Sequence, residues 1–297
     1  MTTKVPNELL EIGVLADATN FTDSILISQN ASTGTLSSAS DNVGIGDDVF
    51  AALTSGRNSV AIGSNSLDAN TSGKNNVAVG HDALTANTTA DSNTAIGKSA
   101  LEANTTGTRN VAIGALALAA NTTANDNVAI GGGTSGVSFA ALAANTTGQY
   151  NTAIGNSALA ANTTADYNTA IGYAALLDNT TGTRNTAMGA FTLDANTTGD
   201  HNTAIGYAVL TANTTADKNT AIGYEAMLAN TTGYDNTAVG RRALDANTEG
   251  HSNTAVGESS LTSNTTGNRN VAIGQNCMAV NTTGGENVAI GRNALDA

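Results

Sequence analysis

Tryptophan is absent from this 297-residue chain, cysteine and proline occur once each, and aromatic residues make up only 3%. Large aromatic side chains usually contribute much of a globular core, so their scarcity argues against an ordinary globular domain. A single proline excludes a collagen-like or proline-rich chain. The lone Cys277 excludes an intrachain disulfide, so cysteine usage says nothing of the redox compartment.

Charge is also scarce, at 12% of residues, and acids outnumber bases to give a formal net charge of −13. So few charges are not typical of a disordered chain. The acidic excess disfavours nucleic acid and anionic membrane surfaces, because binding to phosphates needs a basic face. No apolar run is long enough for a membrane span, and the first 20 residues lack the apolar stretch of a secretory signal. We therefore expect no nucleic-acid partner, no membrane insertion and no signal-dependent export.

The chain is instead rich in a 17-residue repeat. A glycine that closes segments such as Ala-Ile-Gly recurs at this spacing from Gly46 to Gly131 and, after one longer step, from Gly155 to Gly291. The consensus is N-T/V-A-I-G-x-x-A-L-x-A-N-T-T-G-x-x, numbered here as positions 1 to 17. Position 5 is glycine in all fifteen copies, and position 1 is asparagine in all but one, where Ser59 replaces it. A fixed period of this kind is typical of a solenoid.

Each part of the repeat has a structural interpretation. Positions 2 to 4 alternate in the manner of a short strand, with positions 2 and 4 on one face and position 3 on the other. Glycine at position 5 and the Asn-Thr-Thr-Gly segment at positions 12 to 15 suit two bends. Charges occur at positions 6, 7, 10, 16 and 17, with Asp178 and Glu249 as exceptions. The large apolar residues at positions 4 and 9 are then expected to form the interior.

The predicted fold is therefore all-β: a parallel β-roll or β-solenoid, left-handed, of fifteen 17-residue coils with two short strands per coil. One short helix per repeat is the alternative, because alanine and leucine favour helices. The core of such a coil is thin, and thin folds usually gain burial by association. The small residues at position 3 offer a close-packing stripe, and cyclic symmetry would close it into a parallel homotrimer. The predicted trimer-interface residues are Ala61, Ala112, Ala204 and Ala272.

Two regions are expected from this pattern. Residues 1–40 break the repeat and form an N-terminal attachment segment, and residues 41–297 form the repetitive shaft, with a seven-residue insertion at 132–138. The first segment carries an apolar stretch around residues 24–28. Because an exposed apolar patch tends to mark a binding surface, Ile25, Leu26 and Ile27 are predicted to dock the segment on a partner.

Catalysis, cofactor binding and metal binding are not expected. The two out-of-pattern acids, Asp178 and Glu249, lie four coils apart, too far for the paired carboxylates of a glycosidase. The three histidines stand singly at bends, and no aspartate spacing fits a calcium-binding roll. The six tyrosines at positions 6, 16 and 17 have two interpretations, as single exposed bend residues or as a receptor-binding row. The paired threonines at positions 13 and 14 leave an ice-binding solenoid as a remote alternative.

The segment Asn58–Gly63, NSVAIG, and its relatives NTAIG and NVAIG resemble the repeat of YadA-like head domains in trimeric autotransporter adhesins, although the period of 17 is longer here. The resemblance implies a left-handed parallel β-roll, three chains about one axis and a role in adhesion. The opening MTTKVPNELLEIG resembles the N-terminus of phage tail-fibre proteins, which binds the tail or baseplate. Together they predict a virion tail fibre that is docked through residues 1–40 and meets a host-surface receptor at its far end. A bacterial cell-surface adhesin is the alternative.

Overall fold

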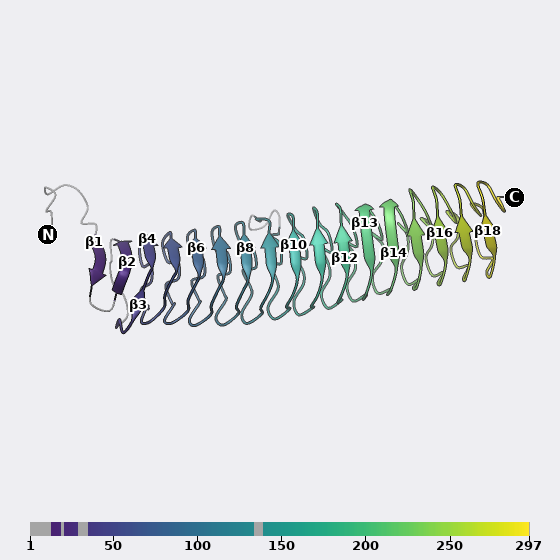
Figure 1. Ribbon diagram of the computed structural model, residues 1–297. Helices are drawn as coiled ribbons and strands as arrows, with labels where there is room; N and C mark the ends of the chain where they lie inside the picture. Colours follow the sequence, from purple (N-terminus) through teal and green to yellow (C-terminus); the bar gives the residue numbers. More distant parts are fainter. Residues whose placement is uncertain (1–12, 19–20, 29–34, 134–138, 297) are drawn as a thin grey trace. The chain divides into compact units, whose positions relative to one another are not determined.

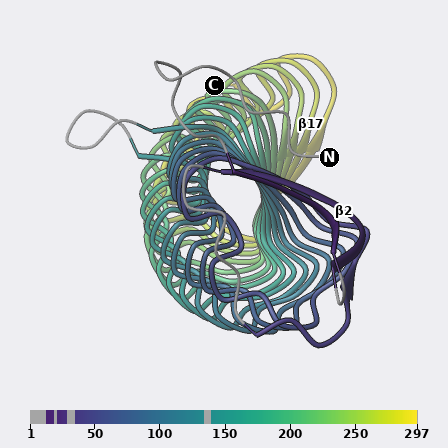
Figure 2. The same cartoon turned by 90° about the vertical axis from the view of Figure 1, so that its left-hand side faces the viewer.

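The computed structural model describes residues 13–18, 21–28, 35–133 and 139–296. These residues fall in two compact units, residues 1–125 and 126–297. Together the units contain a parallel β-solenoid of about fifteen 17-residue turns, and the described residues include no helix. Within each unit the strands of successive turns lie side by side (Figure 1), and the turns of a unit follow one another as similar loops in the end view (Figure 2). The predicted all-β parallel solenoid is confirmed.

The strands are short and mark each repeat. The first unit contains β1 (Gly13–Ala18), β2 (Phe21–Ser28), β3 (Ala39–Ser40), β4 (Val43–Ile45), β5 (Val60–Ile62), β6 (Val77–Val79), β7 (Thr94–Ile96) and β8 (Val111–Ile113). The second contains β9 (Val128–Ile130), β10 (Thr152–Ile154), β11 (Thr169–Ile171), β12 (Thr186–Met188), β13 (Thr203–Tyr207), β14 (Thr220–Tyr224), β15 (Thr237–Val239), β16 (Thr254–Val256), β17 (Val271–Ile273) and β18 (Val288–Ile290). Neighbouring strands pair in parallel with equal repeat positions opposite each other, as Ala61 with Ala78.

The inside and the outside of the strand are reversed from the expectation. The alanine at position 3 is fully buried in every turn from Ala61 to Ala272, whereas positions 2 and 4 on the other face remain half-exposed or exposed. The prediction that the Ile or Val at position 4 fills the interior is therefore wrong. The interior holds the alanine at position 3, the residue at position 8 and the leucine at position 9, which are buried in almost every turn.

Each turn has one strand and not the two that were predicted. Opposite the strand the backbone adopts positive φ at positions 7 and 9, for example 58° at Asp82 and 53° at Leu84. Leu84 donates its N–H to Ala100 O of the next turn at 3.1 Å and accepts the N–H of Asn87 at 3.1 Å. This side is thus a stack of hydrogen-bonded turns. A left-handed φ costs a non-glycine residue about 1–2 kcal/mol. In this fold the leucine that adopts it is completely buried, and the burial offsets this cost.

Two columns of buried asparagines run through the turns. At position 1, the N–H of Asn93 donates to Oδ1 of Asn76 at 2.9 Å, and its side-chain amide donates to Gly107 O at 2.8 Å. At position 12, the side-chain amide of Asn104 donates to Asn87 Oδ1 at 3.2 Å and also to Gly107 O at 3.0 Å. Both columns therefore converge on the carbonyl at position 15. They satisfy backbone groups that a thin apolar core would leave unpaired.

The glycine at position 5 forms the predicted bend. Its φ lies between 124° and 152° in all fifteen copies, a region that L side chains rarely adopt. A Cβ on Gly172 would also lie 2.6 Å from the carbonyl carbon and oxygen of Gly189 in the next turn. Position 5 therefore needs glycine for its backbone conformation and for the closeness of the neighbouring turn.

The N-terminal hairpin covers the first turn. Strand β2 pairs in parallel with β4, with Leu26 opposite Gly44, and β1 pairs antiparallel with β2. Leu26 is fully buried, and a Cβ on Gly44 would lie 2.7 Å from Leu26 Cδ1 and 3.1 Å from Phe50 Cδ2. Gly44 replaces the usual position-3 alanine because Leu26 fills that space. Strand β2 is thus an additional rung that caps the core of the first unit.

The insertion leaves the coil intact. Ala141 donates its N–H to Gly131 O at 3.0 Å, as position 8 does to position 5 in other turns, and Ser157 donates to Phe139 O at 3.0 Å. Phe139 therefore occupies position 6 of its turn. Most of the predicted insertion, residues 134–138, lies outside the described residues.

Candidate functional site

The residues predicted for the trimer interface lie inside the coil. Ala61, Ala112, Ala204 and Ala272 are all fully buried within a single chain, packed on the side of the strand that faces the position-9 leucine. Their side chains present no surface to a second chain, so this assignment is corrected. The alternation of the strand indicated that position 3 faces away from positions 2 and 4, but it did not indicate which face was the inner one.

The outer face of the strands, formed by positions 2 and 4, is uncharged in every turn. We call it the sheet face. In β4 to β18 its residues are Val or Thr at position 2 and Ile, Val or Met at position 4. Ile62, Met188 and Ile222 expose 38%, 40% and 37% of their surface. In the second unit position 2 is threonine in seven consecutive strands, β10 to β16. Sequence reasoning missed this face, although the absence of charge at both positions was a usable signal.

The predicted docking residues of the N-terminal segment divide between the two faces of β2. Leu26 is buried over Gly44, which corrects its assignment to a docking surface. Ile27 is half-buried, and Ile25 exposes 48% of its surface opposite Val43. Ile25 and Ile27 therefore extend the sheet face by one rung, opposite Val43 and Ile45, and Ile25 is the more exposed of the two.

Exposed aromatic side chains gather in the second unit. Tyr173, Phe191, Tyr207 and Tyr224, here called the aromatic ridge, follow the strand at positions 6 and 7 of four consecutive turns. Their ring centroids are separated by 5.3 Å, 6.1 Å and 5.5 Å in that order. The structure thus brings together three tyrosines that the sequence placed at position 6, and it adds Phe191, which sequence analysis did not single out.

A second aromatic group precedes the strand at positions 16 and 17. Tyr150 and Tyr167 stack with centroids 5.0 Å apart, and the guanidinium of Arg184 lies 5.5 Å from the Tyr167 ring centroid. Tyr234 stacks on His251 at 4.7 Å. The first group joins three successive turns through Tyr150, Tyr167 and Arg184, and the second joins two.

The two acids outside the charge pattern of the repeat lie apart. Asp178 and Glu249 are exposed and belong to different turns, as the sequence indicated. Asp194 lies in the turn after Asp178, and burial, with a smaller contribution from Asp178, raises the pKa of Asp194 above its ordinary value. No cluster of three potential metal ligands occurs within the residues that the structure describes.

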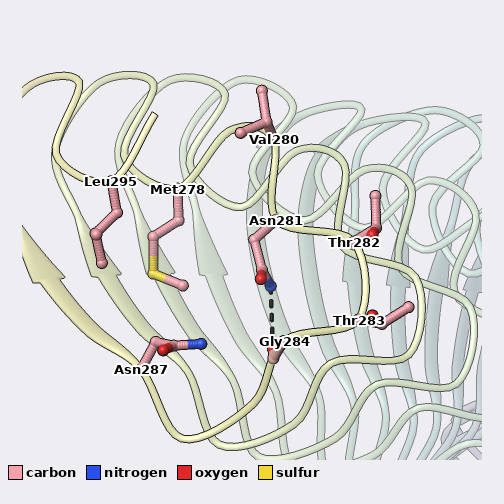
Figure 3. Close-up of a pocket in the computed structure, with 8 residues that line it drawn as sticks. All are labelled: Met278, Val280, Asn281, Thr282, Thr283, Gly284, Asn287 and Leu295. Atoms are coloured by element: carbon pink, nitrogen blue, oxygen red, sulfur yellow. Dashed lines mark hydrogen bonds between the residues drawn. The ribbon is translucent and has the colours of Figure 1, made fainter. Parts of the chain in front are cut away.

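Two hollows lie in the second unit. One, shown in Figure 3, is bordered by the last two turns and has a volume of about 380 Å³. Asn281 donates to Gly284 O at 3.1 Å there, and Leu295, at a position buried in other turns, is exposed. The other, of about 370 Å³, lies beside Phe139 and Leu177 over small alanines. The first hollow is lined by Asn281, Thr282, Thr283 and Asn287 beside three apolar side chains, and the second is mainly apolar.

Comparison of the chain with protein-family models and with curated protein sequences finds no match. In the part of the chain that the structure describes, no helix is long and apolar enough to cross a membrane. The sheet face, the N-terminal cap and the aromatic side chains are therefore the candidate interaction surfaces of the chain.

Proposed function

We propose that the chain is the shaft of an adhesive fibre and acts as a structural, non-catalytic protein that assembles as a parallel homotrimer. The observation that carries the proposal is the sheet face, an uncharged strip of half-exposed Ile, Val, Met and Thr on a chain of net charge −13. A contiguous exposed apolar patch on the surface of a protein tends to mark an interaction site. This proposal moves the predicted interface from position 3 to positions 2 and 4.

A second copy of the same chain is the partner that fits this strip. Equal repeat positions stand opposite each other along the strands. The side chains of position 2, and those of position 4, therefore form two columns in which each residue is one rung, about 4.8 Å, from the next. A parallel copy presents the same columns at the same spacing. Three copies about one axis can turn all three strips inward, and this closed symmetry leaves the charged positions in solvent.

The more specific role proposed is that of a viral tail fibre, with a bacterial cell-surface adhesin as the alternative. The resemblance of NSVAIG at Asn58–Gly63 to adhesin heads and of the opening residues to tail-fibre proteins supports a virion location. The N-terminal segment would bind a tail or baseplate protein, with Ile25 exposed for contact, and the shaft would project toward a host-surface receptor.

Assembly is tested by the mass of the full chain in solution. We expect a trimer by light scattering, and a variant carrying Ile205→Lys and Ile222→Lys, which adds charge to the sheet face, should dissociate. Gln275→Lys is the control for each added lysine, because it places one such charge at exposed position 6, where Lys98 occurs naturally. A wild-type chain that is a stable, folded monomer would overturn the trimer.

The row of seven threonines on the sheet face favours one other function, ice binding, because their spacing follows the regular rungs of β10 to β16. This differs from the threonines at positions 13 and 14, where the position-13 hydroxyl, as in Thr163 and Thr180, donates to the next turn's carbonyl. Thermal hysteresis of a monomeric chain, abolished by Thr203→Lys, would support ice binding. A trimer without thermal hysteresis would exclude it.

A further inference from the structure

We propose that the aromatic ridge, formed by Tyr173, Phe191, Tyr207 and Tyr224, is a binding surface for a neutral glycan. The proposal deepens the adhesive function and rests on it, since it names the site and the chemical class of the receptor. The four rings expose between 36% and 53% of their residue surface in the single chain.

The repeat itself shows that the fold does not require these aromatic residues. In the first unit, position 6 is Asp47, Ser64, His81, Lys98 and Ala115 in successive turns, and in the second unit Asn156 occupies it just before Tyr173. These turns have the same strand and the same glycine bend. Exposed aromatic side chains lower the solubility of a protein, and here they gather in four adjacent turns. Since the fold does not need them, we explain them by ligand binding.

The rings do not form one closed stack. Tyr207 and Tyr224 stack at 14°, but Phe191 stands at 77° to Tyr173 and at 84° to Tyr207. In a continuous face-to-face stack each ring covers the face of its neighbour. The perpendicular contacts of Phe191 leave part of these ring faces accessible. Strands β13 and β14 extend to Tyr207 and Tyr224, which pair directly, so the backbone beneath these two rings is ordered by the sheet.

Polar groups border the ridge at its Tyr224 end. Arg242 Nε donates to Glu225 Oε2 at 2.8 Å, and a side-chain hydrogen bond to Glu225 raises the pKa of Tyr224. Exposed rings beside hydroxyl, carboxylate and guanidinium groups match the chemistry of a sugar. The C–H faces of a pyranose pack on aromatic rings, and its hydroxyl groups need both donors and acceptors.

The charge of the chain selects among glycans. With a net charge of −13, the protein repels polyanions such as sulfated or sialylated chains at a distance. Single-stranded nucleic acid also stacks on aromatic rows, but it requires a basic groove along its backbone. A neutral, linear glycan laid along the turns is the ligand that both the rings and the charge allow.

The test uses the full chain, an array of neutral hexose and N-acetylhexosamine oligosaccharides, and heparin as a polyanion. Affinity for the bound glycans is measured by calorimetry and by tyrosine fluorescence, which no tryptophan obscures. The ridge variant combines Phe191→Ser, Tyr207→Asn and Tyr224→Asn, side chains that occur at the same positions as Ser157 and Asn156. The control is Tyr234→Asn, an equally exposed tyrosine at position 16, where Asn268 occurs naturally.

We expect the ridge variant to bind a neutral glycan at least about ten-fold more weakly, the effect of removing central aromatic anchors, with the control unchanged. Absence of any neutral glycan bound by the wild type, equal affinity in the ridge variant, or preference for heparin would overturn the proposal. The oligomeric mass is measured on the same samples. A trimer that binds no glycan would contradict only the proposed glycan site on the aromatic ridge. A monomer that binds glycan through the ridge would contradict only the proposed trimeric fibre.

Discussion

The backbone N–H of Asn219 donates to the side-chain Oδ1 of Asn202, one turn earlier, at 3.0 Å, and both residues are fully buried. The side-chain amide of Asn202 in turn donates to Ala216 O at 2.8 Å. One asparagine therefore joins two adjacent turns and closes the bend of its own turn. Because each buried amide completes a neighbour's hydrogen bonding, these polar columns contribute to the stability of the solenoid beside its thin apolar core.

Replacement of Asn202 tests this column. Asn202→Ala leaves the buried N–H of Asn219 without its acceptor, which costs about 1–3 kcal/mol. Asn202→Ser should cost less, because the hydroxyl of Ser59 at the same position accepts the N–H of Asn76 at 3.2 Å. Hydrogen exchange at the amide of Asn219 and its neighbours measures the local loss. Equal losses in the two variants would show that the acceptor is not what matters.

The two bends differ in their need for glycine. Gly172→Ala at position 5 imposes a side chain at φ 136° and 2.6 Å from the next turn's carbonyl, so we expect a loss of about 2–4 kcal/mol. The control is Gly182→Ala at position 15 of the same turn, where a Cβ would lie equally close to the next turn, 2.5 Å from Gly199 O, but the φ is not in the left-handed region and other turns carry Ala90, Ala165 and Ala216. Urea denaturation should show a small effect for the control. If Gly172→Ala were as mild, the position-5 bend would tolerate rearrangement.

The buried Ala204 and the half-buried Ile205 of β13 should respond differently to substitution. Ala204→Leu overpacks the interior of the coil, and the expected cost of about 1–3 kcal/mol falls on the fold of the single chain. Thermal unfolding should therefore shift for Ala204→Leu, while its oligomeric mass stays that of the wild type. If Ala204→Leu dissociated without losing thermal stability, position 3 would belong to the interface between chains.

The sequence predicted those features that depend on period and on backbone chemistry. The 17-residue spacing predicted the parallel turns, and the invariant glycine at position 5 predicted the bend. Alternation at positions 2 to 4 grouped the side chains into two faces, but Thr-Ala-Ile reads equally well with either face inward. Size favoured isoleucine inside. The structure has the opposite arrangement: the position-3 alanine is buried together with Leu84 and its equivalents, and the isoleucine at position 4 lies on the outer face.

The candidate sites were less accessible to sequence reasoning. The sequence indicates bend chemistry for the asparagine at position 12 and assigns no role to the asparagine at position 1. The burial of both depends on hydrogen bonds between residues 17 apart, which no local pattern displays. Leu26 appeared exposed because its partner, Gly44, was a single exception in the position-3 column. Phe191 joins the tyrosines only once positions 6 and 7 of adjacent turns are seen to lie together.

Asp194 carries a buried carboxylate oxygen, Oδ1, that has no hydrogen-bond partner among the described residues. Burial, opposed in part by backbone hydrogen bonds and assisted by Asp178, raises the pKa of Asp194 above 3.8. The folded state therefore holds this proton more tightly than the unfolded state. Stability falls as pH rises from about 3.8 through the raised pKa, and it is constant above that value.

Asp194→Thr should remove this cost, because threonine occurs naturally at position 10 as Thr85 and Thr211. We expect the variant to be more stable than the wild type at pH 7, with the difference shrinking as pH falls and disappearing below about 3.8. Asp245→Thr is the control, since the Asp245 carboxylate already accepts the Thr262 hydroxyl at 2.6 Å and its replacement should bring no gain at pH 7. Urea midpoints of both variants between pH 3 and pH 8 make the comparison. An Asp194→Thr gain that is the same at every pH would mean that packing, and not the buried charge, destabilises this turn.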